Sequence, residues 1–129
     1  MDSRRLFVYG SLRPALGHYM QRYLRAFAEH LGPATAKGQI YDLGSYPGFI
    51  EGPGLVQGDL FEIKNPRRLL PPLDLYEGDE YERKFLSIRD GSGAEGTAWI
   101  YIYTREPGNQ RLIESGDYVH YRLNRSEDD

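Results

Sequence analysis

Two short stretches of the sequence combine residue types that could do chemistry. The first is YGSLRP, residues 9–14, which directly follows an apolar run. A strand that ends in a glycine turn can aim successive backbone N–H groups outward, and such a concavity binds a carboxylate or a phosphate. An ordinary glycine turn is the alternative interpretation, and the residues alone leave both open.

The second stretch is LDLYEGDEYER, residues 73–83, which is rich in carboxylates. A catalytic interpretation requires one carboxyl group that faces inward, because desolvation raises its pKa and lets it act as a base. Glu77 is the best candidate, since it directly precedes Gly78 at the expected end of a helix. Asp74 lies three residues earlier on the same helical face and could pair with it. A solvated acidic turn explains the same residues, so this alternative stays open.

The other residues that could do chemistry give weaker signals. The histidines, His18, His30 and His120, lack the spacing of metal ligands. Ser11 and His18 could be imagined as a nucleophile and its base, but the sequence around Ser11 lacks the Gly-x-Ser-x-Gly elbow. We therefore interpret Ser11 as a loop residue that offers its backbone N–H. The sequence contains no phosphate-binding loop and no dinucleotide fingerprint, and we predict neither a metal nor another cofactor.

Composition and charge argue against several classes of protein. The chain has 129 residues, a net charge of −3 with both signs interspersed, and no cysteine. No basic patch is visible, so a nucleic-acid partner is not expected. The absence of cysteine removes disulfides, thiol nucleophiles and thiolate metal sites. No apolar run is long enough for a signal peptide or a membrane span, so we expect a cytoplasmic protein without a membrane partner.

Hydrophobic periodicity and turn residues predict the elements that must position these side chains. Strands are expected over residues 5–9, 36–43, 55–63, 81–89 and 96–103. Helices are expected over residues 18–27, with Gly32-Pro33 as the stop, and from an Asn65 cap to Gly78. Residues 44–54 are predicted to form turns, and residues 112–123 an irregular or strand-like end.

This order of elements predicts an α+β fold with a mixed or antiparallel sheet. Long strands between glycine turns could curl into a barrel, but closure does not follow from the residues. One domain is expected over residues 1–129, with an ordered core over about residues 4–123 and a charged C-terminal tail. A proline inside a helix costs about 3 kcal/mol, so Pro71-Pro72 predicts two short helical turns, at about residues 66–70 and 72–76.

Six stretches of the sequence resemble the gamma-glutamylcyclotransferase family of the AIG2-like superfamily, and the last of them its little-characterised bacterial branch. They follow one another in the family's order over about residues 4–122. The stretches are VYGSLR (8–13), YDLGSYPG (41–48), VQGDLF (56–61), LDLYEGDEYER (73–83), AWIYIY (98–103) and LIESGDY (112–118). The resemblance implies a mixed β-barrel flanked by helices, with a pocket at one mouth.

The resemblance also implies an activity. Glu77 stands at the position of the family's catalytic acid and would take a proton from the α-ammonium group of a gamma-glutamyl substrate. The freed amine would attack the γ-carbonyl and give 5-oxoproline and a free amine, without a cofactor. The carboxylate of the substrate would be held by backbone N–H groups of the first loop, which consists of Tyr9, Gly10, Ser11 and Leu12.

Three further residues, Arg13, Tyr46 and Tyr118, are candidates for contact with the substrate. Arg13 could help to hold an anion, although a surface arginine is an equally good interpretation. The expected partner is a small gamma-glutamyl molecule, and the chain is expected to be a monomer or a weak homodimer. The alternative is a non-catalytic protein that binds a small carboxylate or amide. In that case Glu77 would face solvent or pair with Arg83 or Arg13.

Overall fold

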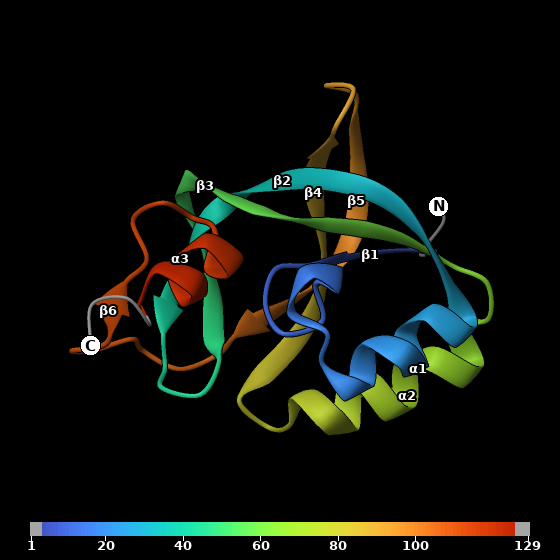
Figure 1. Ribbon diagram of the computed structural model, residues 1–129, viewed down its shortest axis with the longest axis horizontal. Helices are drawn as coiled ribbons and strands as arrows, with labels where there is room; N and C mark the ends of the chain where they lie inside the picture. Colours follow the sequence, from blue (N-terminus) through green and yellow to red (C-terminus); the bar gives the residue numbers. More distant parts are fainter. Residues whose placement is uncertain (1–3, 126–129) are drawn as a thin grey trace.

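The computed structural model describes residues 4–125. Its elements are β1 (Arg5–Val8), the 3-10 turn η1 (Pro14–Leu16), α1 (Tyr19–Phe27), β2 (Ala28–Asp42), β3 (Pro47–Ile63), α2 (Pro66–Glu77), β4 (Tyr81–Asp90), β5 (Glu95–Tyr103), β6 (Arg111–Leu112) and α3 (Tyr118–Arg125) (Figure 1). The strands predicted over residues 81–89 and 96–103 are confirmed as β4 and β5, which pair as an antiparallel hairpin. Residues 126–129 of the predicted charged tail lie outside the described residues.

Five strands close into a ring. Antiparallel pairs join β1 to β3, β3 to β2, β2 to β4 and β4 to β5. A parallel contact between β1 and β5, at Leu6 and Trp99, closes the barrel, and β6 extends the sheet beyond β2. In Figure 1, α1 and α2 lie side by side along one side of the barrel, and α3 lies on another side. The predicted α+β class and mixed barrel are confirmed.

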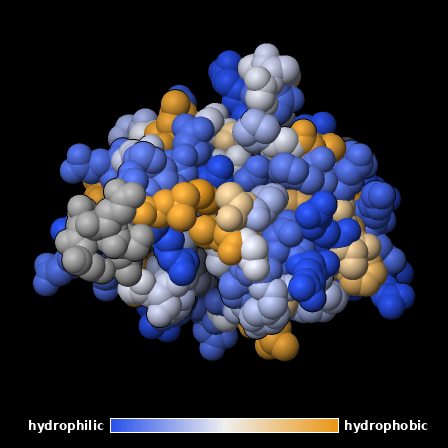
Figure 2. Space-filling model, viewed as in Figure 1, coloured by the Kyte–Doolittle hydropathy of each residue, from blue (hydrophilic) through white to orange (hydrophobic). Residues whose placement is uncertain are grey.

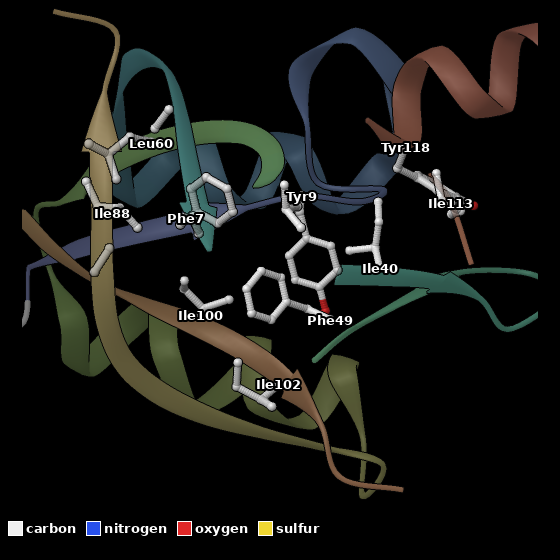
Figure 3. Packing of buried hydrophobic residues seen from close by; sticks show 14 residues of the cluster. Phe7, Tyr9, Ile40, Phe49, Leu60, Ile88, Ile100, Ile102, Ile113 and Tyr118 are labelled. Atoms are coloured by element: carbon white, nitrogen blue, oxygen red, sulfur yellow. The ribbon is translucent and has the colours of Figure 1, made fainter. Parts of the chain in front are cut away.

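The hydrophobic core has two parts, and β1 contributes to both. Phe7 and Tyr9 belong to the cluster that fills the barrel, where the rings of Tyr9 and Phe49 pack with centroids 5.4 Å apart (Figure 3). Leu6 and Val8 alternate with them and belong to the cluster that includes residues of α1 and α2. Because β1 is buried on both faces, it is a rigid support for the loop that follows it.

The prediction that Gly32-Pro33 stops the first helix is wrong, because α1 ends at Phe27 and β2 begins at once. The carbonyl of Phe27 accepts a hydrogen bond from the backbone N–H of Lys64 at 2.8 Å, and β2 pairs with β3 from Ala28 on. Gly32 has a φ of +123° and lies where the register of the β2–β3 ladder shifts. The glycine and the proline therefore shape a bulge inside one long strand.

Residues 44–54 are less turn-like than predicted, because β3 already starts at Pro47. The β2–β3 ladder passes from Leu55 directly to Ile50, so the predicted turn residues 51–54 form an excursion within the strand. Gly38 of β2 stands opposite this irregularity. A Cβ atom at that position would lie 2.5 Å from the ring of Phe49, so the close approach of the two strands requires glycine.

The prediction of two short helical turns around Pro71 and Pro72 is also wrong, because α2 is one continuous helix. A proline at position 72 leaves the carbonyl of Arg68 without its usual helical donor. The hydroxyl of Tyr23, on α1, donates a hydrogen bond to that carbonyl at 2.7 Å. The neighbouring helix thus replaces the donor that proline lacks, and α2 can run on to the residue before Gly78.

The end of the chain contains a helix that the sequence reasoning missed. Only Leu112 of the predicted strand-like end belongs to a strand, and Tyr118 begins α3. The carboxylate of Asp117 accepts a hydrogen bond from the backbone N–H of His120 at 3.1 Å, so Asp117 caps the helix. An aspartate before this short segment was the available signal for a helix start.

The surface of the described residues is mostly polar. Figure 2 shows hydrophilic residues over most of the face seen in Figure 1, interrupted by a short band of hydrophobic residues. Exposed large hydrophobic side chains include Leu55, Leu75 and Leu123. Within residues 4–125, no helix has the length and apolar character that crossing a membrane requires.

Candidate active site

A cavity of about 340 Å³ opens where β1 ends. Its walls come from β1 and the following loop, the start of β3, the end of α2, and strands β4 and β5. Glu77 is the only charged side chain among the described residues that line it. Five of the lining residues are tyrosines, namely Tyr9, Tyr46, Tyr76, Tyr81 and Tyr101. The cavity therefore combines one carboxyl group with aromatic, weakly polar walls.

The loop after β1 contributes all four of its predicted residues, 9–12, to the cavity wall. The carbonyl of Gly10 accepts a hydrogen bond from the N–H of Arg13 at 3.0 Å, which closes a tight turn. Gly10 does not adopt a positive φ. Glycine is needed because a Cβ atom would lie 2.9 Å from the ring of Pro47. Within residues 4–125, the N–H groups of Ser11 and Leu12 donate to no backbone acceptor outside the regular elements.

Glu77 is the last residue of α2 and is half-buried in the cavity wall. Gly78, with a φ of +87°, lets the chain turn away directly after it. The Glu77 carboxyl makes no hydrogen bond or ion pair with the side chains of residues 4–125. Burial, and to a smaller extent the negative charge of Asp74, raises the pKa of Glu77 to about 7.

Asp74 lies one turn earlier on α2 and is held in the opposite way. Its two oxygens accept hydrogen bonds from the Arg83 guanidinium at 2.8 and 3.0 Å, and one of them also accepts the Tyr101 hydroxyl at 2.7 Å. The hydrogen bonds from Arg83 lower the pKa of Asp74. The guanidinium also lies over the ring of Trp99, 4.3 Å from its centroid. These contacts tie the end of α2 to β4 and β5.

The tyrosines of the cavity wall are neutral phenols with assigned partners. Tyr9 donates its hydroxyl hydrogen bond to the carbonyl of Tyr101 at 2.7 Å, and Tyr81 donates to the carbonyl of Pro47 at 2.6 Å. Burial raises the pKa of both Tyr9 and Tyr81. Tyr46 is half-exposed and donates to the carboxylate of Glu80 at 2.8 Å. None of these three groups can act as a base at neutral pH.

Ser11 and His18 do not contact each other as a nucleophile and base would. The hydroxyl of Tyr76 lies between them, 3.3 Å from Ser11 Oγ and 3.0 Å from His18 Nε2. His18 Nδ1 accepts a hydrogen bond from the backbone N–H of Met20 at 3.1 Å and so caps α1. The interpretation of Ser11 as a loop residue agrees with this arrangement.

Two of the predicted substrate-binding residues lie outside the cavity wall, which corrects their expected position. Arg13 donates hydrogen bonds to Asp59 and to Asp117, both at 2.9 Å, and these ion pairs hold it behind the loop. Tyr118 is buried to 1% exposure in the barrel core beside Ile113, as Figure 3 shows. The local sequence could not reveal the position of Arg13, because its partners are distant in the chain.

The structure adds lining residues that the sequence reasoning did not select. Tyr76 and Tyr81 flank Glu77 within the acidic stretch, Tyr101 lies near the end of β5, and Pro47 starts β3. The two tyrosines beside Glu77 could have been inferred from their proximity to the candidate acid. Tyr101 carried no such signal, since it lies far from both stretches that were singled out in the sequence. Among residues 4–125, no three His, Asp or Glu side chains gather as metal ligands would.

Comparison with known proteins identifies the family. Residues 6–120 match the family model described as gamma-glutamyl cyclotransferase, AIG2-like. The gamma-glutamylcyclotransferase family protein YtfP of Escherichia coli (strain K12) is 39% identical over 120 residues, which cover 89% of this chain and 96% of that protein. The protein of the same name from Citrobacter rodentium is 38% identical over 120 residues, which cover 89% and 95%.

A solved structure shares the fold over its full length. An uncharacterized protein from Pyrococcus horikoshii superposes with a TM-score of 0.74 at 25% sequence identity, and the match covers 97% of this chain and 98% of that one. The resemblance to the family and to its bacterial branch, inferred from the sequence, is confirmed. The chain belongs to the gamma-glutamyl cyclotransferase, AIG2-like family.

Proposed function

We propose that this protein is a gamma-glutamylcyclotransferase that converts a gamma-glutamyl amine or a gamma-glutamyl amino acid to 5-oxoproline and a free amine. The observation that carries the proposal is the Glu77 carboxyl, which is half-buried in the cavity wall and has a pKa of about 7. A carboxyl group with a pKa near the working pH can accept a proton and return it within one turnover.

The loop after β1 supplies the proposed anion site. The N–H groups of Ser11 and Leu12 have no backbone acceptor outside the regular elements of residues 4–125, and both residues line the cavity. The described lining residues include no arginine, lysine or histidine. With no cationic side chain among them, the backbone N–H groups of this loop are the donors that we propose for the carboxylate of the glutamyl group.

The proposed reaction needs one proton shuttle. Glu77 accepts a proton from the substrate's α-ammonium group, and the freed nitrogen attacks the γ-carbonyl carbon to form the ring C–N bond. Glu77 then gives that proton to the departing nitrogen as the original amide C–N bond breaks. The second proton that the attacking nitrogen loses passes to the released amine, which leaves as an ammonium ion. Nucleophile and electrophile belong to one molecule, so holding the substrate in a folded conformation supplies much of the rate.

The contacts of Glu77 do not favour the alternative of a non-catalytic binding protein. That alternative expected Glu77 to face solvent or to pair with Arg83 or Arg13. In the structure, Arg83 binds Asp74 and Arg13 binds Asp59. The carboxyl of Glu77 is thereby left for a ligand.

The test is the release of 5-oxoproline from a panel of gamma-glutamyl amines and gamma-glutamyl amino acids. The wild type is compared with Glu77→Gln and with Glu82→Gln, a matched change at an exposed carboxylate of the same stretch. We expect release by the wild type and by Glu82→Gln, and a loss of about 10²- to 10⁴-fold in Glu77→Gln.

Two control substrates sharpen this test. An N-acetylated gamma-glutamyl amine lacks the free α-amine and should give no product, and an α-linked glutamyl isomer should give none either. Equal release by the wild type and Glu77→Gln would show that another group carries the proton. No release from any substrate by folded wild-type protein would contradict the proposed function.

A further inference from the structure

Three side chains form a hydrogen-bonded chain that reaches the cavity from behind its wall. Ser11 and Tyr76 line the cavity, and His18 does not. Tyr76 Oη lies 3.0 Å from His18 Nε2 and 3.3 Å from Ser11 Oγ. The proposed reaction gives these three hydrogen-bonded side chains no role. The inference drawn from them rests on the proposed function in one respect, namely the identity of the ligand.

The backbone N–H of Met20 fixes the direction of these hydrogen bonds at the His18 end. The N–H of Met20 can only donate, and it contacts His18 Nδ1 at 3.1 Å. Nδ1 must therefore carry a lone pair, and the proton of the neutral imidazole belongs to Nε2. Nε2–H then donates to Tyr76 Oη. This tautomer also prevents His18 from taking a proton from Tyr76.

A count of protons shows what the Ser11 and Tyr76 hydroxyls, at the other end of these hydrogen bonds, can donate. The Tyr76 and Ser11 hydroxyls have one proton each, and a single proton joins them, whichever of the two donates. Tyr76 Oη already accepts from His18, so His18 cannot accept the second proton. Apart from these contacts, no side chain of residues 4–125 is a hydrogen-bond partner of Ser11 Oγ or Tyr76 Oη. One hydroxyl proton is thus left for the cavity.

We propose that His18 and Tyr76 form a relay that keeps one hydroxyl proton, on Ser11 or on Tyr76, available to an oxygen atom of the bound ligand. The matching ligand group is a carboxylate or carbonyl oxygen. Ser11 and Tyr76 would touch the ligand, and His18 is a positioning residue that acts through Tyr76. Successive hydrogen bonds in such a chain polarise one another, which strengthens the last donor.

The first test is spectroscopic and needs no turnover. Protein labelled with ¹⁵N in histidine is observed by long-range ¹H–¹⁵N NMR at pH 8, and His18→Asn assigns the signal. We expect one protonated nitrogen, Nε2, and one unprotonated nitrogen, Nδ1. A proton on Nδ1 would overturn the relay, because the chain would then run in the opposite direction.

The second test measures the affinity for L-5-oxoproline, a carboxylate that cannot react further, by calorimetric titration. Tyr76→Phe removes the central hydroxyl and should weaken binding about 10-fold. Tyr19→Phe is the matched control: Tyr19 packs against the rings of His18 and Tyr76 but is 70% exposed, and its hydroxyl makes no hydrogen bond with residues 4–125. Its affinity should equal that of the wild type.

His18→Asn separates the two roles of the imidazole. Asparagine is a good helix cap, so the N–H of Met20 keeps an acceptor, while the shorter side chain cannot reach Tyr76. We expect the thermal midpoint to stay within a few degrees of the wild type and the affinity to fall about 2- to 5-fold. Unchanged affinity in a folded His18→Asn protein would contradict the positioning role.

The outcomes separate this inference from the proposed function. If the wild type releases 5-oxoproline but Tyr76→Phe binds it as tightly as Tyr19→Phe, the relay is wrong and the proposed function stands. If no gamma-glutamyl compound is converted but the affinities fall in the expected order, the relay stands without the reaction. If the wild type does not bind L-5-oxoproline at all, the ligand role of the relay is wrong.

Discussion

The polar groups on the two sides of the loop after β1 differ in whether other residues of the protein bind them. On the cavity side, the carboxyl of Glu77 makes no hydrogen bond or ion pair with a side chain of residues 4–125. The N–H of Ser11 donates to no backbone acceptor outside the regular elements of the same residues. Behind the loop, Arg13 binds one oxygen of Asp59 and also binds Asp117, while His30 contacts the other Asp59 oxygen at 2.9 Å. We call the second group the Arg13 cluster.

This difference separates groups that hold the fold from groups that are free to bind a ligand. A buried polar group without a partner is costly, so a folded protein keeps such groups where something other than the protein completes them. In the Arg13 cluster, Arg13 of the loop after β1 and His30 of β2 complete the carboxylates of Asp59, on β3, and of Asp117, directly before α3. Changes on the cavity side should therefore affect activity, and changes in the Arg13 cluster should affect stability.

The largest expected effect lies on the cavity side. Glu77→Gln should lower 5-oxoproline release by about 10²- to 10⁴-fold, because the proton shuttle is lost while the shape of the side chain is kept. Release is measured at saturating substrate, and unfolding by urea is measured on the same sample at pH 5. If Glu77→Gln lost its fold and not only its activity, the cavity side of the loop would also hold the fold, and the proposed difference between the two sides would be wrong.

The Arg13 cluster should show the reverse pattern. Arg13→Met leaves the buried carboxylate of Asp59, which is 9% exposed, without its cation, and should lower the free energy of unfolding by about 3 kcal/mol. The control is Arg89→Met, which breaks the exposed pair with Glu95 and should cost less than about 1 kcal/mol. Urea unfolding at pH 7 measures both, and equal costs would show that the Arg13 cluster is not a structural unit.

The raised pKa of Glu77 predicts a pH effect on stability. Its pKa is about 7 in the folded protein and 4.5 in an unstructured peptide, so between these values the folded state binds more protons than the unfolded state. The free energy of unfolding should therefore fall as pH rises from 4.5 to 7, by on the order of 2 kcal/mol. In Glu77→Gln this part of the pH dependence should vanish, which unfolding curves at pH 5 and pH 8 would reveal. A larger pH dependence in the variant would contradict the raised pKa.

The smallest expected effect concerns the neighbouring carboxylate. The charge of Asp74 is the second cause of the raised pKa of Glu77, after burial, so Asp74→Asn should lower that pKa. The rising limb of kcat/KM against pH, which reports the base of the free enzyme, should move to lower pH by a fraction of a unit. Asp79→Asn, at an exposed carboxylate beyond Gly78, should leave the limb in place. A shift toward higher pH would show that the charge of Asp74 does not raise the pKa of Glu77.

Local sequence signals sufficed for the parts of the molecule that depend on neighbouring residues. The loop after β1, the Asn65 start of α2 and the β4–β5 hairpin follow from glycine, proline and asparagine at their usual positions. Those signals also placed Glu77 at the end of a helix. The side-chain roles that the family resemblance assigned to Glu77 and to the loop stay predictions until the reaction is measured.

Three of the errors share one physical cause, because each depends on a partner far away in the chain. Gly32-Pro33 could not stop a helix that pairing with β3 had already ended. The helix around Pro72 is continuous because Tyr23 supplies a hydrogen bond from α1. Arg13 was drawn away from the cavity by carboxylates 46 and 104 positions later. No local pattern contains such contacts.

The stacking of Arg83 on Trp99 gives the protein a built-in optical reporter. Trp99 is the single tryptophan of the chain, so the intrinsic indole emission has one origin. The cation above its ring, 4.3 Å from the centroid, is the same guanidinium that binds Asp74. Asp74 lies one helical turn before Glu77, so any displacement of the end of α2 changes the electric field at the indole. A ligand that displaces the end of α2 would therefore change the emission of Trp99, which can be followed in solution without a label.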